Sequence, residues 1–155
     1  MSRLIYLDNA ATTKTAPEVV DAMIPYFTEH YGNPSSVYSF ASGNKEVVSR
    51  QREIIAQALG AQANEIYFTA GGSESDNWAL KATAEAYEKK GKHIITTKIE
   101  HHAILHTCEY LEKQRGFEIT YLDVDENGVV KLDELKKAIR PDTILISVMF
   151  ANNEI

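Results

Sequence analysis

Three short polar segments each follow an apolar segment, and their residue types are suited to binding an anionic or aromatic ligand. The first is Gly71-Gly72-Ser73, which follows the apolar residues 65–69 and precedes a run of helical character. Glycines let the backbone approach an anion closely, and a helix N-terminus presents free N–H groups at the positive end of its dipole. The Ser73 hydroxyl would add a donor. The segment therefore fits a phosphate-binding turn and, equally well, a tight strand-to-helix turn capped by Ser73.

The second polar segment is Glu100-His101-His102, which directly follows an apolar segment that ends at Thr97. An imidazole at this position is able to stack on an aromatic ligand or to move a proton near neutral pH. The alternative is a polar loop in which both histidines cap the next helix. His102 and His106 also have the four-residue spacing of helical metal ligands. Because neither an HExxH motif nor an evident third ligand accompanies them, we expect no metal site here.

The third polar segment is Asn152-Asn153-Glu154, at the end of the apolar residues 143–151. Two adjacent amides at the carboxyl end of a strand are able to hydrogen-bond a ligand oxygen, and equally able to form a turn. Cys108, the only cysteine, fits a small buried core residue better than a reactive thiol.

A fourth pattern, over residues 123–134, matches the spacing of an EF-hand calcium loop through Asp123, Asp125, Asn127, Gly128 and Glu134. An EF-hand needs a helix that enters at the first of these residues. Residues 117–122 are strand-like instead and follow Gly116, which favours an Asn-Gly turn between a strand and a helix. A non-catalytic calcium-binding module at residues 123–134 is the alternative from a different functional class.

Alternating strands and helices must position these segments. Apolar residues at helical spacing predict helices over residues 17–27, 45–59, 73–91, 102–115 and 132–139. Shorter apolar runs predict strands over residues 65–69, 93–97, 117–122 and 143–151. This alternation predicts an α/β fold, with a mostly parallel sheet flanked by helices on both faces. Ligands of such folds bind beyond the carboxyl ends of the strands, where the three polar segments lie.

Local signals predict where these elements begin and end. Pro17 suits a first helical turn, and Ser73 with Asp76 resembles a capping box at a helix start. Gly60 and Gly116 are expected just past helix ends, and the turn formers at residues 31–36 predict a loop.

The composition excludes several classes of protein. The chain has 155 residues with a net charge of −6, 44% apolar residues and 25% charged residues, which is typical of a globular domain with one core. The absence of a basic run argues against nucleic-acid binding, and no apolar run approaches the ~20 residues of a membrane span. The start of the sequence lacks the apolar region of a secretion signal, and a single cysteine fits a reducing cytosol. We therefore expect a cytoplasmic protein.

The most apolar predicted strand, residues 143–151, has no crossover helix after it. A parallel sheet that stopped there would leave this apolar strand unprotected. We therefore expect the sequence to be a piece of a longer chain.

Five motifs occur in register along the chain: residues 6–13 (YLDNAATT), 32–36 (GNPSS), 68–77 (FTAGGSESDN), 97–102 (TKIEHH) and 152–155 (NNEI). In this order they resemble the cysteine desulfurases of the nitrogen-fixation and iron–sulfur-cluster branch. That branch belongs to the class V aminotransferase group of fold-type I enzymes, which use pyridoxal 5'-phosphate (PLP). The resemblance implies that residues 1–15 are an N-terminal segment contributing to the small domain. Residues 16–155 would then be an incomplete PLP-binding large domain, covering with that segment well under half of a typical family member.

The resemblance also implies a reaction and its partners. PLP would act as the electron sink while the enzyme takes sulfur from L-cysteine and leaves L-alanine, with the sulfur held as an enzyme-bound persulfide. The family forms homodimers, and it passes sulfur to an iron–sulfur scaffold or to another acceptor such as a tRNA-thiolation relay.

The resemblance also implies roles for five residues, according to their positions in these motifs. Gly72 and Ser73 would hold the PLP phosphate, although the family more often has Ala-Thr there. His101 would stack on the pyridine ring and assist proton transfer. Asn153 would lie beside the cofactor hydroxyl and the substrate carboxylate, and Asn9 would lie near the substrate.

The departure from the family is an absence. The Schiff-base lysine, the aspartate that partners the pyridine nitrogen, the substrate-carboxylate arginine and the persulfide cysteine all come later in the family and have no counterpart here. Lys98 and Cys108 do not lie in the corresponding motifs. We therefore expect these 155 residues alone to be inactive. The alternatives are another class V enzyme, such as a selenocysteine lyase, and a truncated non-catalytic relic kept as an interaction protein.

Overall fold

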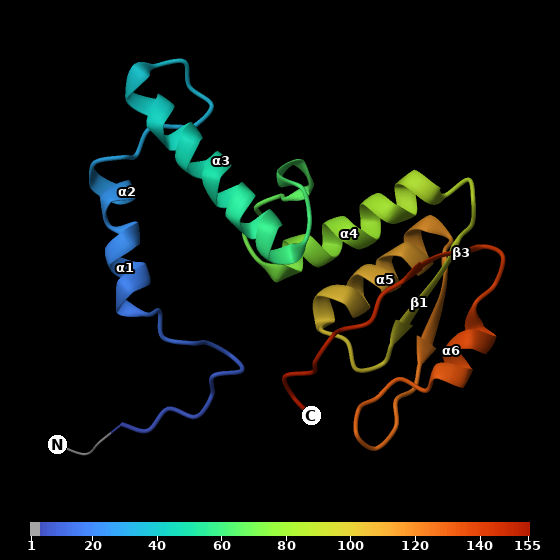
Figure 1. Ribbon diagram of the computed structural model, residues 1–155. Helices are drawn as coiled ribbons and strands as arrows, with labels where there is room; N and C mark the ends of the chain where they lie inside the picture. Colours follow the sequence, from blue (N-terminus) through green and yellow to red (C-terminus); the bar gives the residue numbers. More distant parts are fainter. Residues whose placement is uncertain (1–3) are drawn as a thin grey trace. The chain divides into compact units, whose positions relative to one another are not determined.

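The computed structural model describes residues 4–155, and Figure 1 shows its elements. Contacts between Cα atoms divide the chain into two compact units, Met1–Phe68 (unit 1) and Thr69–Ile155 (unit 2). The expected division after residue 15 stays a prediction, and residues 1–3 of that segment lie outside the described residues. None of the helices in residues 4–155 has the length and apolarity needed to cross a membrane.

Unit 1 contains helices α1 (Pro17–Met23), α2 (Pro25–Thr28) and α3 (Ser39–Leu59), followed by the 3-10 helix η1 (Ala63–Glu65). The single helix predicted over residues 17–27 is divided in two because Pro25 has no N–H to continue the helical ladder. Proline instead begins each of the two helices, where the first N–H has no partner in any case. The helix predicted from Lys45 begins six residues earlier, at Ser39.

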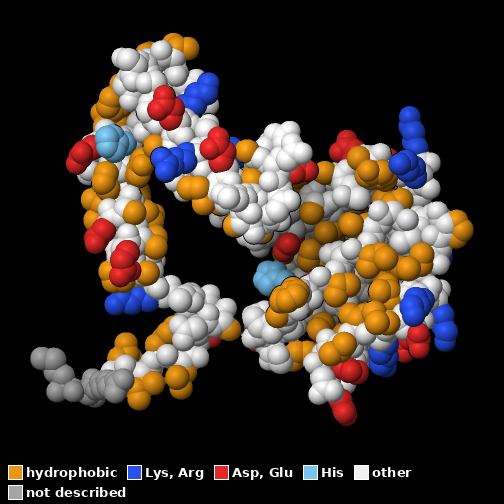
Figure 2. Space-filling model, viewed as in Figure 1, with side chains coloured by type: hydrophobic (Ala, Val, Ile, Leu, Met, Phe, Trp, Pro, Cys, Tyr) orange, Lys and Arg blue, Asp and Glu red, His pale blue; other side chains and the backbone are white. Residues whose placement is uncertain are grey.

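Unit 1 buries few of its side chains. In α3 the buried residues are Ala41, Asn44 and Ala56, whereas most of the apolar stripe predicted on that helix is exposed. The Asn44 amide donates to the carbonyls of His30 and Gly32, both at 2.6 Å, and so fixes the predicted loop at residues 31–36 against the helix. Figure 2 shows the apolar side chains that remain at the surface in both units.

The strand predicted over residues 65–69 is wrong. The Ile66 backbone is extended, but residues 66–69 are not part of the described sheet, because an apolar run does not by itself make a ladder. Arg52 holds this stretch instead, because its guanidinium donates to the Ile66 carbonyl and lies 4.7 Å from the centre of the Phe68 ring.

Unit 2 is built on three parallel strands, β1 (His93–Thr97), β2 (Glu118–Leu122) and β3 (Thr143–Ile146), in the order β2-β1-β3. The predicted parallel sheet is therefore confirmed. All five residues of the central strand β1 are buried. The strand predicted over residues 143–151 is shorter than expected, and its last pairing is the bond from the Ser147 N–H to the Ile95 carbonyl.

Helices α4 (Gly72–Tyr87) and α5 (His102–Arg115) pack against each other and the sheet, while α6 (Leu132–Ala138) contacts β2. Their shared core consists of Leu80, Ala84, Ile94, Ile104, Cys108, Leu111 and Phe117. The bounds predicted for α5 are confirmed, and Gly116 ends it in the left-handed region at φ 67°. Helix α4 ends at Tyr87 rather than Gly91. A side chain at Gly91 would collide with the backbone of Asp142, so a close approach of two chain segments requires glycine there.

The loop between β2 and α6 is the predicted turn. The Asp125 carboxylate accepts hydrogen bonds from the N–H groups of Asn127 (2.9 Å) and Val129 (2.8 Å), and Gly128 has a φ of 77°. Because strand β2 rather than a helix leads into the loop, the structure around it differs from that of an EF-hand.

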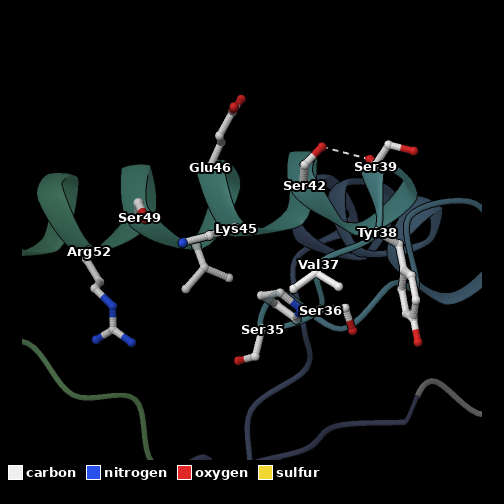
Figure 3. A pocket seen from close by; sticks show the side chains of 12 residues that line it. Ser35, Ser36, Val37, Tyr38, Ser39, Ser42, Lys45, Glu46, Ser49 and Arg52 are labelled. Atoms are coloured by element: carbon white, nitrogen blue, oxygen red, sulfur yellow. Dashed lines mark hydrogen bonds between the residues drawn. The ribbon is translucent and has the colours of Figure 1, made fainter.

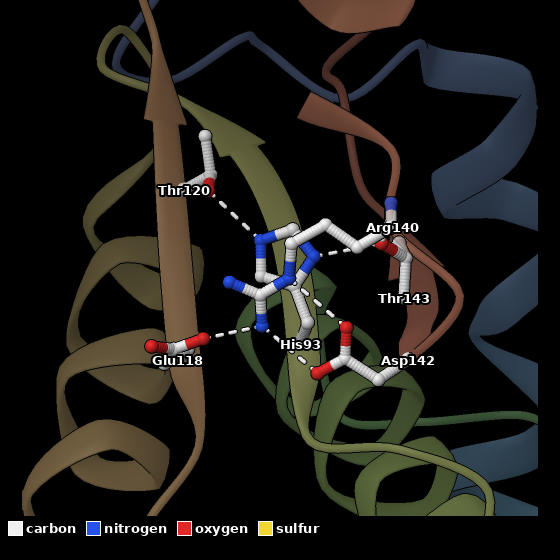
Figure 4. A network of polar contacts seen from close by, with 6 residues as sticks. All are labelled: His93, Glu118, Thr120, Arg140, Asp142 and Thr143. Atoms are coloured by element: carbon white, nitrogen blue, oxygen red, sulfur yellow. Dashed lines mark hydrogen bonds and ion pairs between the residues drawn. The ribbon is translucent and has the colours of Figure 1, made fainter. Parts of the chain in front are cut away.

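A polar network joins the three strands at their amino ends (Figure 4). The ring of His93 is fully buried, and its two nitrogens contact the hydroxyls of Thr143 (2.7 Å) and Thr120 (2.8 Å). Next to it, Arg140 forms a bidentate pair with Asp142 and an ion pair with Glu118. Burial, followed by the charge of Arg140, lowers the pKa of the His93 imidazole, so the ring is held neutral.

Candidate functional site

The candidate site lies on two loops that follow adjacent parallel strands in unit 2. Residues 98–101 follow the carboxyl end of β1, and residues 147–155 follow that of β3. These loops carry His101 and Asn153, two of the predicted site residues. In open α/β folds this edge of the sheet is where ligands bind.

The start of α4 provides N–H groups that no described residue accepts. Gly71 is the N-cap and has no side chain, so the N–H groups of Gly72 and Ser73 remain free in residues 4–155. No heavy atom outside the immediate chain neighbours lies within 4 Å of where a Cβ on Gly72 would be, which leaves the approach to these groups open. The Ser73 hydroxyl likewise makes no hydrogen bond to a described residue. Two free amides and a hydroxyl at a helix N-terminus suit a phosphate group.

The predicted capping box between Ser73 and Asp76 is wrong. The helix begins one residue earlier than predicted, so the third helical position is Glu74, whose carboxylate accepts from the Ala70 N–H at 2.6 Å. This bond fixes the glycine turn without using the Ser73 side chain. The hydroxyls of Thr69 and Ser75 meet at 2.7 Å and hold the same turn.

Asn77 connects this turn to helix α5. Its amide nitrogen donates to the Ser73 carbonyl at 2.9 Å, and its amide oxygen accepts from the Thr107 hydroxyl at 2.8 Å. The first turn of α4 is thereby tied to the helix that begins directly after His101.

His101 is the N-cap of α5, and Nδ1 of its exposed ring accepts from the Ala103 N–H at 3.0 Å. A neutral ring that accepts at Nδ1 carries its proton on Nε2. The predicted capping role is therefore confirmed for His101. Capping leaves Nε2 without a hydrogen-bond partner among the described residues, and the ring meets the His102 ring edge-on with centroids 6.5 Å apart. Capping and ligand binding are therefore compatible.

His102 lies inside the first turn of α5, and its ring stacks on that of His106 with centroids 5.3 Å apart. Within residues 4–155, no group of three or more His, Cys, Asp or Glu side chains is arranged to hold a metal ion. The pair is therefore a contact between successive turns of the helix.

The two adjacent asparagines have different roles. Asn152 donates from its amide to the Ile99 carbonyl at 2.7 Å, and its amide oxygen accepts from the N–H groups of Glu154 (2.6 Å) and Ile155 (3.2 Å). Asn153 is exposed, and its side chain contacts only the neighbouring Glu154 carboxylate, at 3.1 Å. The predicted turn therefore belongs to Asn152, and Asn153 is the amide that remains accessible.

Glu100 is a functional candidate that sequence reasoning named only as part of a segment, without a role of its own. Its side chain is buried, with 8% exposed, and Oε1 accepts from the Thr97 hydroxyl (2.9 Å) and the Met149 N–H (2.8 Å). A charged residue directly after a buried strand was the available signal, because a buried carboxylate requires hydrogen-bond donors nearby.

The remaining predicted residue, Asn9, belongs to unit 1. It lies in a turn, and its carbonyl accepts from the Thr13 hydroxyl at 3.3 Å. Gly72, Ser73, His101 and Asn153 all belong to unit 2. The proximity of Asn9 to the substrate stays a prediction.

Lys98 and Cys108 both make contacts that stabilise the fold. Lys98 forms an ion pair with Asp123 at 2.7 Å, and this pairing lowers the pKa of the Asp123 carboxyl. Cys108 is completely buried, and burial raises the pKa of its thiol to about 11, with smaller contributions from Glu100 and Glu112. The prediction that Cys108 is a core residue is confirmed.

Unit 1 contains an open groove along α3 (Figure 3). Serine hydroxyls line it together with Lys45, Glu46 and Arg52. Ser42 donates to the carbonyl of Ser39, and Arg52 to that of Ile66, so part of its polar lining already bonds to the backbone. With both signs of charge present, the groove shows less preference for one kind of ligand than the free N–H groups of α4 do.

Comparison with known proteins gives concordant results. Residues 5–155 match the family described as aminotransferase class-V. The chain is 60% identical over 155 residues to the cysteine desulfurase IscS of Clostridium botulinum (strain Kyoto / Type A2), which covers 100% of this chain and 39% of that protein. It is also 60% identical over 154 residues to the cysteine desulfurase IscS of Methanosarcina thermophila, covering 99% of this chain and 38% of that protein.

Solved structures show the same likeness. One described as a NifS-like protein superposes with a TM-score of 0.91 at 45% identity, covering 95% of this chain and 40% of that one. Another, SspA in complex with cysteine, gives a TM-score of 0.88 at 40% identity, covering 94% of this chain and 42% of that one. The chain thus spans about two fifths of the length of the relatives it matches.

Proposed function

The chain belongs to the class-V aminotransferase family, and from this premise we propose that it is the amino-terminal part of a PLP-dependent cysteine desulfurase. The substrate would be L-cysteine and the products L-alanine and a sulfur atom carried on the enzyme. Identity of 60% to two proteins named cysteine desulfurase IscS supports the proposal, as does likeness to a structure described as a complex with cysteine.

The observation that carries the proposal is the pair of free N–H groups on Gly72 and Ser73, beside an unpaired Ser73 hydroxyl. These groups would hold the phosphate of PLP. The exposed ring of His101 would stack on the pyridine, and the accessible amide of Asn153 would contact the cofactor hydroxyl and the substrate carboxylate. The donors present therefore fit the cofactor.

The protein groups would do the following work. PLP, when bound, supplies the electron sink for the reaction. Nδ1 of His101 is occupied by the cap of α5, so Nε2 is the ring atom that would pass a proton to a bound group. The Asn153 amide would orient the substrate carboxylate. The helix dipole of α4 would stabilise the phosphate charge.

Several groups that the family needs have no counterpart in the 155 residues: the Schiff-base lysine, the pyridine-nitrogen aspartate, the substrate-carboxylate arginine and the persulfide cysteine. Cys108 does not substitute for the last, because its thiol is buried and its pKa is raised to about 11. We therefore propose that these residues alone do not turn over cysteine.

The test is to express the polypeptide from its complete gene and to measure the alanine and sulfide produced from L-cysteine with PLP, in the presence of dithiothreitol, which reduces the persulfide sulfur to sulfide. We expect equal amounts of both products, and no sulfide from the 155-residue segment alone. Cys108→Ala is the matched control and should leave the turnover of the complete polypeptide unchanged. Sulfide production by the isolated segment, or its absence from the complete polypeptide, would contradict the proposal.

Substrate choice separates the two class V candidates. A desulfurase should release sulfide from L-cysteine, whereas activity confined to L-selenocysteine would assign a selenocysteine lyase. We further propose a cytoplasmic homodimer that delivers sulfur to an iron–sulfur scaffold or another acceptor protein. Light scattering of the complete polypeptide tests the dimer, and transfer of radioactive sulfur to a candidate scaffold tests the acceptor.

A further inference from the structure

Beyond the end of the sheet, side chains continue the pairing of β1 with β3. The last backbone bond between these segments runs from the Ser147 N–H to the Ile95 carbonyl. Two further hydrogen bonds then cross between the loops, and both are donated from the loop after β3 to the loop after β1. Glu100 accepts from the Met149 N–H at 2.8 Å, and Asn152 donates to the Ile99 carbonyl at 2.7 Å. Each loop thus contributes one side chain that bonds to the other loop's backbone.

We propose that Glu100 and Asn152 form a clamp that holds the loop bearing His101 and the loop bearing Asn153 in one fixed arrangement. The two residues are positioning residues, since they act through the neighbours that face the ligand. The inference rests on the proposed function for its effect on catalysis, while the coupling between the loops stands on the hydrogen bonds alone.

Burial makes the Glu100 half of the clamp costly to break. With only 8% of the residue exposed, removal of the carboxylate would leave the Thr97 hydroxyl and the Met149 N–H without an acceptor in a poorly hydrated place. Glutamine keeps a carbonyl oxygen that is able to accept both bonds. Alanine therefore removes the clamp, and glutamine preserves its geometry without the charge.

The amide oxygen and the amide nitrogen of Asn152 have different partners. Its amide oxygen closes the turn around Asn153 by accepting from Glu154 and Ile155, while its amide nitrogen alone reaches the other loop. Aspartate keeps the first interaction. It also places an oxygen against the Ile99 carbonyl and against Met149 Sδ, which the amide nitrogen contacts at 3.5 Å. Asn152→Asp therefore keeps the turn and removes the bond between the loops.

Hydrogen exchange of the complete polypeptide tests the coupling without depending on activity. If the clamp couples the loops, Asn152→Asp should increase exchange about tenfold at the start of α5, where Ala103 bonds to His101. Glu100→Ala should do the same for residues 147–155. Asn127→Asp and Glu126→Ala make the same chemical changes in the exposed turn after β2 and should alter neither region. Faster exchange confined to the substituted loop would overturn the proposal.

Turnover and spectroscopy test the consequence for the site. Glu100→Ala and Asn152→Asp should each lower kcat for L-cysteine about tenfold to a hundredfold, with a smaller change in KM, and should alter the visible circular dichroism of bound PLP. Glu100→Gln should stay within about threefold of wild type. If both damaging variants keep a wild-type kcat and dichroism per folded molecule, the clamp does not position the site. If wild type releases no sulfide, the proposed function fails, while the exchange experiment still decides the coupling.

Discussion

The two edges of the sheet in unit 2 each carry a histidine, and the structure holds the two rings in opposite ways. At the amino edge, His93 is fully buried and both ring nitrogens contact threonine hydroxyls (Figure 4). At the carboxyl edge, His101 is exposed and uses only Nδ1, as the acceptor that caps α5. One imidazole has all its hydrogen bonds satisfied by the protein, whereas the other retains a nitrogen with no hydrogen-bond partner in residues 4–155.

The same contrast extends to the surrounding groups. Beside His93, the Arg140 guanidinium pairs with the carboxylates of both Asp142 and Glu118. At the carboxyl edge, the N–H groups of Gly72 and Ser73 find no acceptor among the described residues. A polar edge whose groups are satisfied stabilises the fold, and one that leaves donors free is prepared for a ligand.

The largest effect should come from His101. In the complete polypeptide, His101→Asn keeps an N-cap acceptor for α5 but removes the ring, so sulfide release should fall about 100-fold or more while thermal stability is kept. His101→Ala should lose the same activity and, in addition, about 1 kcal/mol of stability. Turnover and thermal unfolding measure the two effects separately. If the turnover of the His101→Asn enzyme stays within fivefold of wild type, His101 has only a structural role, as His93 does.

The second effect should come from His93 and is the reverse: the protein loses stability but keeps its catalytic turnover. His93→Ala leaves a cavity and two threonine hydroxyls without their partner, so the free energy of unfolding should fall by about 2–4 kcal/mol. Turnover per folded molecule should be unchanged. Denaturant unfolding measures the difference, with the exposed His106→Ala as control, expected within about 0.5 kcal/mol. A smaller loss of unfolding free energy in His93→Ala than in His106→Ala would refute the contrast between the edges.

The third effect is a pH dependence of stability that comes from His93 at the amino edge. Burial and Arg140 lower the pKa of His93 in the folded state, while Asp142 and Glu118 oppose the shift. The unfolded chain therefore takes up the proton first, at about pH 6.5, and the free energy of unfolding should fall as the pH drops below that value. The slope is at most about 1.4 kcal/mol per pH unit. His93→Gln should reduce this slope in unfolding curves measured between pH 7.5 and 5.

The smallest effect should separate Gly72 from Ser73 at the carboxyl edge. Ser73→Ala removes one donor to the phosphate and should weaken PLP binding by the complete polypeptide about fivefold, or ~1 kcal/mol. Gly72→Ala adds a Cβ where nothing lies within 4 Å, and should leave PLP affinity unchanged. Fluorescence titration with PLP measures both. Equal losses of PLP affinity in the two variants would show that the space available at this turn, rather than the Ser73 hydroxyl, determines the affinity.

Sequence reasoning succeeded where the signal is local. Helix α5 has the predicted bounds because an apolar face, a preceding histidine cap and Gly116 all lie within one short segment. It failed where a distant partner decides. Residues 65–69 have the composition of a strand but lie outside the described sheet, and β3 stops at Ile146 because its ladder with β1 ends there, although the apolar run continues.

The site follows the same rule. Gly72, Ser73, His101 and Asn153 were found because each lies in a recognisable motif. The clamp was missed because its bonds join residues 49 and 53 positions apart in the sequence, which neither spacing nor composition reveals. The start of α4 was misplaced by one residue, since Glu74 and Ser73 are both good first-turn residues and only geometry shows which one accepts a bond.

The strand order has a consequence for synthesis on the ribosome. The central strand β1 is made first, and its neighbours β2 and β3 follow, the Thr143 partner of His93 coming 50 residues later. At about 5–20 residues per second, the most buried strand of unit 2 waits roughly 3–10 s for its second neighbour. During that interval its apolar side chains are available to chaperones and to other nascent chains. The order in which the strands are translated, and not only their apolarity, therefore determines how long the core of unit 2 is exposed in the cell.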